Sequence, residues 1–420
     1  MSGEAQWDYK RIITKGSEGA VTMEFSQRIG RISVSPTAAV VQKAAKLTAA
    51  GVDVVDFGAG EPDFPTPENI KRAAIEALNK NFTKYTPTGG TRELREAIVW
   101  RHVQDFGSNY AVEECLVTVG GKHAIFEAVA ALINHGDEVI LPVPYWVSFL
   151  DIVNYAGGKV VLLETRESEH FAIRADAVER LVTPKTKLLI VNSPSNPSGA
   201  VVPPEEMEKL LTLAERRGFI LMSDECYCHF LYDGRKPFSL GASRNREHLV
   251  IVGSLSKTYS MTGWRVGYAL GAAPLISNML NLQSHSTSNP TSIAQKAAVE
   301  AQRGPQDSVQ QMLAEYTRRR DRIVAGLRAI PGVQCVMPEG AFYVYPNVGQ
   351  VLDKAGFADS TALVERLLEE EHVALVPGPA FGTREHVRFS YATSTERIDE
   401  GLRRLRQFIS KLVPAYAQAR

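Results

Sequence analysis

The stretch that decides the fold and the chemistry is Ser254-Leu255-Ser256-Lys257-Thr258-Tyr259-Ser260-Met261-Thr262-Gly263-Trp264-Arg265. It follows an apolar run, His248 to Gly253, that is typical of a buried strand. A lysine at the end of such a strand is costly to bury unless it forms an ion pair or a covalent bond. Lys257 therefore predicts a functional site at this point of the fold.

One strong solution for a buried lysine is a Schiff base, in which the amine becomes part of an imine. Ser254 and Ser256 before the lysine, and Arg265 after it, are residue types that bind phosphate. Together they predict a site for a phosphorylated aldehyde, and the cofactor that fits this description is pyridoxal phosphate. The alternative, a surface loop with one lysine and one arginine, does not account for the full set.

Length and composition limit the class of protein. A chain of 420 residues is too long for one ordinary core, so we expect two domains. Lys plus Arg and Asp plus Glu both total 47, and this balance gives no reason to expect nucleic acid or an anionic membrane as a partner. The four cysteines are too few for a disulfide framework, no secretory signal is visible near the N-terminus, and a cytoplasmic location is expected.

From about Pro65 to Pro290, short apolar runs alternate with stretches of helical spacing. The runs are apolar on both sides, which predicts a mostly parallel sheet covered by helices, an α/β architecture. The strands are expected at Cys115 to Gly120, Glu138 to Leu141, Val160 to Leu163, Lys187 to Val191, Phe219 to Ser223 and Leu249 to Val252.

The final part of the chain has long charged helices around short strands, which predicts a smaller α+β unit. The segment before about Gly60 is expected to pack with it. We therefore predict an N-terminal arm at residues 1–30, a small domain made of 31–60 and 302–420, and a large cofactor-binding domain at 61–301.

Polar residues follow several of the expected strands, where ligands of α/β proteins bind. Asn196 lies in a proline-rich loop and could donate its amide to a phenolate oxygen, or could be an ordinary turn residue. Asp224 could pair with a protonated pyridine nitrogen and Tyr227 could bond the phenolic oxygen of the ring. The alternatives are an N-cap aspartate and a core tyrosine. Cys226 and Cys228 lack the partner spacing of a metal site, and no metal is predicted.

Two further segments carry groups that bind anions. Gly120-Gly121-Lys122 passes from a strand to a helix, where exposed backbone N–H groups can bind phosphate. Lys122 could hold a second anion, or could be a solvated lysine at a helix start. Arg388 lies within an apolar run and could clamp a substrate α-carboxylate, or could form an internal salt bridge.

The order of these motifs resembles the class I aminotransferases of fold type I, the aspartate aminotransferase family. The resemblance runs from about Ile29 to Phe408. It rests on the lysine segment together with Gly60-Glu61-Pro62-Asp63-Phe64, Lys84-Tyr85, Gly120-Gly121-Lys122, Pro144-Tyr145-Trp146, Asn196-Pro197, Ser223-Asp224-Glu225 and Arg388.

The resemblance implies a role for each matching residue. Lys257 would hold pyridoxal phosphate, Asp224 would pair with the pyridine nitrogen, and Trp146 would stack on the ring. Asn196 and Tyr227 would contact the ring oxygen. The phosphate would be surrounded by Gly121 and Lys122 through their backbone, by Ser254, Ser256 and Arg265, and by Tyr85 of a second subunit in a homodimer with shared active sites.

The implied reaction moves an amino group from an amino acid to a 2-oxo acid in a ping-pong cycle. Lys257 would transfer the proton of the substrate Cα, with Asp224 and Tyr227 as the other catalytic residues. Arg388 would bind the α-carboxylate, with Gly60, Asn196 and Trp146 close by.

The substrate is predicted from a difference between two branches of the family. One branch has an arginine four positions before a Ser-Asn-Pro motif, but here Ser284 precedes Ser288-Asn289-Pro290 at that distance. The other branch, which this chain resembles, uses a lysine with a Ser-x-Thr near the N-terminus, here Lys122, Ser35 and Thr37. Aspartate and glutamate are therefore the expected donors, with oxaloacetate and 2-oxoglutarate as their partners and prephenate as a further acceptor.

Two other functions use the same scaffold. A lyase or synthase, such as a carbon–sulfur lyase or an aminocyclopropane carboxylate synthase, would retain Lys257, Asp224 and Arg388. A cofactor-sensing regulator would carry a DNA-binding domain first, whereas only about thirty residues precede the resemblance here, and they are neither basic nor patterned as a helix-turn-helix.

Overall fold

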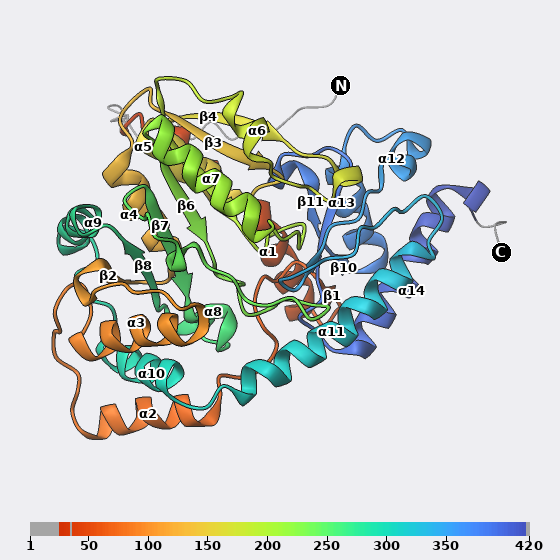
Figure 1. Cartoon of the computed structure of the whole chain (residues 1–420). Coiled ribbons are helices and arrows are strands. Elements are labelled where there is room, and N and C mark those ends of the chain that lie inside the picture. Colours follow the sequence, from red (N-terminus) through yellow and green to blue (C-terminus); the bar gives the residue numbers. More distant parts are fainter. Residues whose placement is uncertain (1–24, 34–35, 417–420) are drawn as a thin grey trace, which may run out of the picture.

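A seven-stranded sheet forms the centre of the larger part of the molecule (Figure 1). The structure is a computed structural model, and it describes residues 25–33 and 36–416. The strand order is β2-β8-β7-β6-β5-β3-β4. The bounds are β2 Cys115–Thr118, β3 Glu138–Val143, β4 Lys159–Glu164, β5 Thr186–Asn192, β6 Ile220–Asp224, β7 Leu249–Ser254 and β8 Gly267–Gly271.

The sheet is mostly parallel, which confirms the predicted α/β architecture. Only β8 is antiparallel to its neighbours, β2 and β7. Strands β2 and β7 therefore run in the same direction. Strand β8 is absent from the predicted set. It begins and ends with glycine, a residue that weakens a strand pattern, and it comes directly after a segment dominated by turns.

Helices cover both faces of the sheet because successive side chains of each strand point to opposite sides. In β5, Leu189 and Val191 belong to one hydrophobic cluster, whereas Leu188 and Ile190 belong to another. The first cluster includes side chains of α2 (Glu68–Asn79), α3 (Arg92–Phe106), α6 (Ala175–Glu179), α7 (Pro204–Arg217) and α10 (Ser292–Arg303), and the second includes side chains of α4 (Gly121–Leu132), α5 (Val147–Ala156) and α9 (Ala273–His285).

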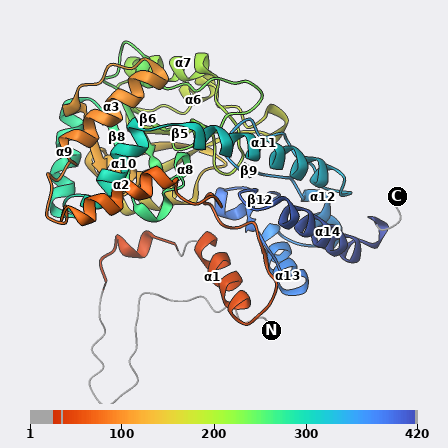
Figure 2. The same ribbon diagram turned by 90° about the horizontal axis from the view of Figure 1, so that it is seen from below.

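A second unit combines residues 36–56 with the C-terminal part of the chain (Figure 2). Strand β1 pairs in parallel with β10, so the segment directly before Gly60 contacts the C-terminal part. A three-stranded antiparallel sheet has the order β11-β12-β9. The elements are β1 Val55–Asp56, β9 Tyr343–Val344, β10 Val373–Ala374, β11 Val376–Pro377, β12 Val387–Ser390, α1 Pro36–Ala49, α12 Gly349–Ala355, α13 Ser360–Glu371 and α14 Thr395–Leu412.

Helix α11, Asp307–Arg328, joins the two parts of the molecule (Figure 1). Val309 near its start belongs to the core of the large sheet. Met312, Tyr316 and Leu327 further along belong to the core of the second unit. The domain bounds proposed from the sequence stay a prediction, and most of the proposed N-terminal arm lies outside the described residues.

Short helices connect these elements. The α-helix α8 (Leu255–Thr258) carries the lysine of the motif described above. The 3₁₀ helices are η1 Ile29–Arg31, η2 Val112–Glu114, η3 Glu167–Glu169, η4 Leu240–Ala242, η5 Thr262–Trp264, η6 Gly378–Phe381 and η7 Pro414–Tyr416.

The topology brings distant sequence motifs to one edge of the sheet. Strands β2, β5, β6 and β7 run in the same direction, so their carboxyl ends lie at the same edge. The residues that follow them are Gly120, Asn196, Glu225 and Lys257 with their neighbours. In the part of the chain that the structure describes, no helix has the length and apolar character needed to span a membrane.

The first residue of β8 allows a close backbone approach at this edge. Gly267 pairs with Thr118 on one side and with Ser254 on the other. A Cβ atom at Gly267 would lie 2.2 Å from the backbone nitrogen of Gly121, which begins α4. Any larger residue would therefore push the start of α4 away from the sheet.

We expect Gly267→Ala to lower the free energy of unfolding by about 1–3 kcal/mol, because the new methyl group has backbone atoms and no flexible side chain to displace. Chemical denaturation of the purified variant measures this loss. Gly263→Ala is the matched control, since a Cβ there meets no atom within 4 Å. Equal stabilities of the two variants would contradict the close approach.

Candidate active site

One cavity of about 280 Å³ lies at the carboxyl edge of the large sheet. It brings together twelve of the residues that the sequence analysis placed in the site, and these come from both parts of the molecule. They are Gly60, Gly121, Lys122, Trp146, Asn196, Asp224, Tyr227, Ser254, Ser256, Lys257, Arg265 and Arg388.

Lys257 lies in α8, directly after β7, and its side chain reaches into the cavity. Its Nζ donates a hydrogen bond to the carbonyl oxygen of Gly60. Burial lowers the pKa of Lys257 to about 8, against the opposing effect of Cys226 and Glu61. A lysine with this pKa has a large neutral fraction at mildly alkaline pH, and the neutral amine is the nucleophilic form.

Asp224 is the last residue of β6 and is 4% exposed. Its Oδ1 accepts a hydrogen bond from the backbone N–H of Cys226 at 3.1 Å. Burial raises the pKa of Asp224, an effect that the Cys226 hydrogen bonds and the nearby charge of Lys257 oppose. Residues 226–229 form a turn, so Asp224 is not the N-cap of a helix. Among the described residues it has no ion-pair partner, and a protonated nitrogen of a ligand could take that place.

Asn192 was not predicted, although it opens the motif that contains Asn196. It is the last residue of β5, and its Nδ2 donates to the carbonyl oxygen of Asp224 at 3.2 Å. Its Oδ1 accepts from the backbone N–H of Asn196 at 2.8 Å. Asn192 therefore fixes the Asn196 loop to the end of β6.

The start of α4 forms an anion cradle together with Arg265. Gly120 is the N-cap, with a φ of 80°, and leaves the first backbone N–H groups of α4 exposed to the cavity side. A Cβ at Gly120 would lie 2.5 Å from Nη2 of Arg265, so the guanidinium lies against the backbone there. Ser254 accepts a hydrogen bond from the Ser256 N–H at 3.1 Å, which leaves its own hydroxyl proton free for an anion.

Arg388, in β12, is 2% exposed. Its Nη2 donates to the carbonyl oxygen of Gly58 at 2.6 Å, and its Nη1 donates to Oδ1 of Asn196 at 3.1 Å. Its Nε has no partner. No carboxylate forms an ion pair with it within residues 25–33 and 36–416, so the alternative of an internal salt bridge is wrong. Burial lowers the pKa of Arg388, and an anionic ligand would relieve that cost.

The orientation of Asn196 follows from this contact. A guanidinium can only donate, so the atom of Asn196 that faces Arg388 is the amide oxygen. The amide NH₂ group is then available to donate to another acceptor in the cavity. Asn196 is thus both a turn residue and a wall of the site.

Tyr227 is likewise both a core residue and a cavity residue. Its hydroxyl lies 2.8 Å from the hydroxyl of Tyr343, which also lines the cavity and was not predicted. Tyr343 lies in an apolar run, Ala341 to Tyr345, whose spacing indicates a strand but does not reveal which side chains reach the site.

Lys122 and Trp146 lie on the same side of the cavity. The Lys122 Nζ is 5.0 Å from the centre of the Trp146 ring, a cation–π distance. Lys122 is exposed, so its ammonium is accessible to a ligand.

Three further residues complete the predicted set: Tyr85, Ser35 and Thr37. The side chain of Tyr85 is 90% exposed and does not line the cavity. Ser35 and the side chain of Thr37 lie outside the described residues. Their roles stay predictions.

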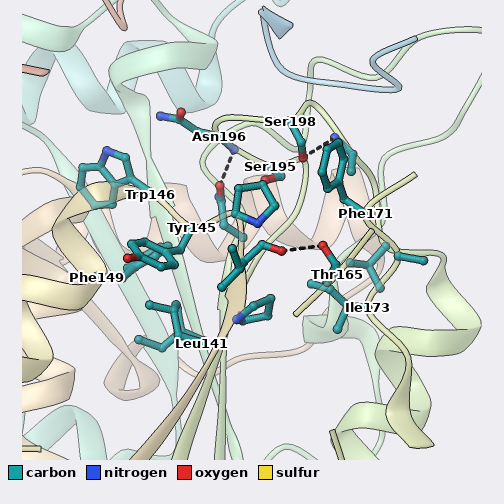
Figure 3. A pocket seen from close by; sticks show the side chains of 18 of the residues that line it. Leu141, Tyr145, Trp146, Phe149, Thr165, Phe171, Ile173, Ser195, Asn196 and Ser198 are labelled. Atoms are coloured by element: carbon teal, nitrogen blue, oxygen red, sulfur yellow. Dashed lines mark hydrogen bonds between the residues drawn. The ribbon is translucent and has the colours of Figure 1, made fainter. Parts of the chain in front are cut away.

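A smaller cavity of about 30 Å³ adjoins the site, and Figure 3 shows it with Trp146 and Asn196 at its border. It shares these two residues and Asn192 with the larger cavity. Its walls are mostly apolar, with Phe149 and Ile173 among them, and no described residue that lines it carries a charge. Its volume is enough for one or two water molecules. The larger cavity, with its amine, carboxylate and guanidinium, is therefore the candidate active site.

Comparison with known proteins agrees with this assignment. Residues 52–405 match the family described as aminotransferase class I and II. The chain is 43% identical to an aspartate aminotransferase of Bacillus subtilis, over 93% of this chain and 100% of that one. It is 41% identical to an aspartate/prephenate aminotransferase of Nitrosomonas europaea, over 92% and 100% of the two chains.

Solved structures agree as well. An aspartate aminotransferase of Thermus thermophilus, solved with maleate, superposes with a TM-score of 0.88 at 43% identity and covers 92% of this chain and 100% of its own. One from Rhizobium meliloti also has a TM-score of 0.88, at 40% identity, with 92% and 99% of the two chains covered. With its sheet, its lysine cavity and these relatives, the chain belongs to the aminotransferase class I and II family.

Proposed function

We propose that the cavity binds pyridoxal phosphate and that the protein transfers the amino group of aspartate or glutamate to a 2-oxo acid, with prephenate as a further acceptor. One observation carries this proposal. The Lys257 amine, the Asp224 carboxylate and the Arg388 guanidinium, which lie far apart in sequence, line one cavity.

The residues present fit this cofactor. The lack of a Cβ at Gly120 lets the Arg265 guanidinium lie against the start of α4, which places a cation beside the first backbone N–H groups of the helix, as a phosphate requires. Asp224 is a buried carboxylate without an ion-pair partner among the described residues, as a pyridine nitrogen requires. Asn196 has a free amide donor and Tyr227 a phenol for the ring oxygen.

When bound, pyridoxal phosphate supplies an aldehyde that captures the amino group and a ring that takes up negative charge from the substrate Cα. Asp224 would hold the proton of the ring nitrogen and keep the ring cationic. The Arg388 guanidinium would bind the substrate α-carboxylate and so orient the substrate in the cavity. The Lys257 amine would accept the proton from the substrate Cα and would later donate it from the same side of the cavity.

Lys122 supports a dicarboxylate substrate. Its side chain lines the cavity, and partial burial together with the charge of Arg265 lowers the pKa of Lys122. A substrate carboxylate beside the ammonium would offset this effect. The Thermus thermophilus relative was solved with maleate, a four-carbon dicarboxylate. The position expected for the alternative arginine holds Ser284, in α9.

The assembly proposed is a homodimer with shared active sites. The exposed Tyr85 is free to reach a second copy, and the phosphate cradle of that copy is the acceptor implied by the family resemblance. A cytoplasmic location remains an expectation from composition.

Lys257 should be the attachment point. Borohydride treatment of the protein with pyridoxal phosphate should fix the cofactor on Lys257, as read by peptide mass spectrometry. Lys257→Ala should lower transamination by a factor of about 10⁴, because both the covalent link and the proton transfer are lost. Lys122→Ala is the control and should still be labelled at Lys257. Label on another residue would disprove the assignment, and product release without a 2-oxo acid would favour a lyase.

Lys122 should determine the preference for dicarboxylates. We expect Lys122→Ala to lower kcat/KM for aspartate by about ten- to a hundredfold, since a charged hydrogen bond is lost, and to change kcat/KM for alanine by less than about threefold. Lys122→Met, which keeps the apolar stem beside Trp146, should behave like Lys122→Ala. Equal losses for both substrates would remove Lys122 from the specificity role.

Cofactor capture should depend on pH through the Lys257 amine. Burial disfavours the ammonium and brings the pKa of Lys257 to about 8. The rate at which the cofactor-free protein binds pyridoxal phosphate should therefore rise about tenfold per pH unit below pH 8 and level off above it. Stopped-flow absorbance between about pH 6 and 10 measures this rate. A plateau reached only near the ordinary lysine pKa would contradict the effect of burial.

A further inference from the structure

Tyr343 lies in β9 of the second unit, and its side chain is fully buried yet lines the cavity. It contacts three parts of the site at once. Its hydroxyl is 2.8 Å from that of Tyr227, and its ring centre is 4.8 Å from the guanidinium carbon of Arg388. A Cβ added to Gly60 would lie 3.1 Å from the Tyr343 hydroxyl.

Either tyrosine could donate the hydrogen bond between Tyr227 and Tyr343, and the direction depends on whether Tyr227 also donates to a ligand. A phenol carries one proton to donate, and its oxygen can also accept. Burial raises the pKa of both Tyr227 and Tyr343, so both hydroxyls keep their protons. If Tyr227 donates to a ligand, the bond between the tyrosines must be donated by Tyr343.

The ring of Tyr343 has a separate contact. The guanidinium carbon of Arg388 lies over the ring of Tyr343 and also over that of Phe381, whose centre is 5.3 Å away. Two aromatic faces hold the plane of a buried cation and leave its edge free for hydrogen bonds. The plane of Arg388 therefore depends on Tyr343.

We propose that Tyr343 is a positioning residue for the aminotransferase reaction. Its hydroxyl donates to the oxygen of Tyr227, so that Tyr227 donates its own proton to the ring oxygen of the cofactor, and its ring fixes Arg388 for the substrate carboxylate. This inference rests on the proposed binding of pyridoxal phosphate in the cavity.

The hydroxyl has a spectroscopic consequence. A phenol that accepts a hydrogen bond becomes a stronger donor, so Tyr343 strengthens the bond from Tyr227 to the ring oxygen. With pyridoxal phosphate bound, this hydrogen bond would stabilise negative charge on the ring oxygen. The bound cofactor would then lose its proton at a lower pH, and its absorbance would report that change.

The test is a pH titration of the absorbance of the cofactor-loaded protein. Tyr343→Phe keeps the ring and removes only the hydroxyl, and its midpoint should rise by about half a unit to one unit. In a Tyr227→Phe background the same substitution should cause no further shift, because Tyr343 acts through Tyr227. A midpoint equal to that of the unsubstituted protein, or an equal shift in both backgrounds, would overturn the proposal.

Tyr345→Phe is the matched control. Tyr345 follows β9 directly, is buried, and donates or accepts a hydrogen bond with Thr383 at 2.6 Å, but it does not line the cavity. Removing the Tyr345 hydroxyl should leave the midpoint of the pH titration unchanged. If Tyr345→Phe shifts the midpoint as much as Tyr343→Phe does, the effect is a general one of this strand and the role of Tyr343 is overturned.

The ring is tested with Tyr343→Leu. This variant should raise KM for the amino donor by about three- to tenfold beyond Tyr343→Phe, because Arg388 loses an aromatic face. Equal KM values for the two variants would overturn the role of the ring. Thermal melting of the cofactor-free variants shows whether each is folded. If the unsubstituted protein shows no absorbance from a bound cofactor, the proposed function itself fails, and the role of Tyr343 fails with it.

Discussion

The site depends on the way β8 is placed between two strands that run in the opposite direction to it. Its first residue pairs with the last residues of both neighbours, so the ends of β2 and β7 are held at one level. The glycine at this position lets the start of α4 come against the sheet. The backbone N–H groups of α4 and the lysine helix α8 thereby come to share a single cavity.

Three charged groups of this cavity, those of Asp224, Lys257 and Arg388, are shielded from solvent and have no ion-pair partner among the described residues, and this arrangement costs stability. Asp224 has a raised pKa, Lys257 a lowered pKa and Arg388 neutral partners only. A zwitterionic substrate or a charged cofactor would supply each of these groups with a partner of opposite charge. The strain on these groups is thus explained by binding and not by the fold itself.

The parts of the site that follow apolar strands could be predicted from the sequence. Lys257 and Asp224 come at the ends of β7 and β6, and the carboxyl ends of parallel strands meet at one edge. The adjacent Glu225 faces a different, water-sized cavity beside His102, so Asp224 is the carboxylate of this pair that reaches the site. Tyr343 and Asn192 were missed because their roles arise from contacts with residues more than thirty positions away or with a turn. Strand β8 was missed because its sequence is not typical of a strand, and its pairing with β2 and β7 is what makes it one.

The long helix α11 mechanically couples the two parts of the molecule, because it contributes side chains to both cores. One end of it is embedded in the core of the large sheet and the remainder in the core that holds Arg388. A helix of 22 residues is about 33 Å long and bends little. A tilt of α11 about its first turn would therefore displace the far core, and Arg388 with it, by more than it displaces the residues near Asp307.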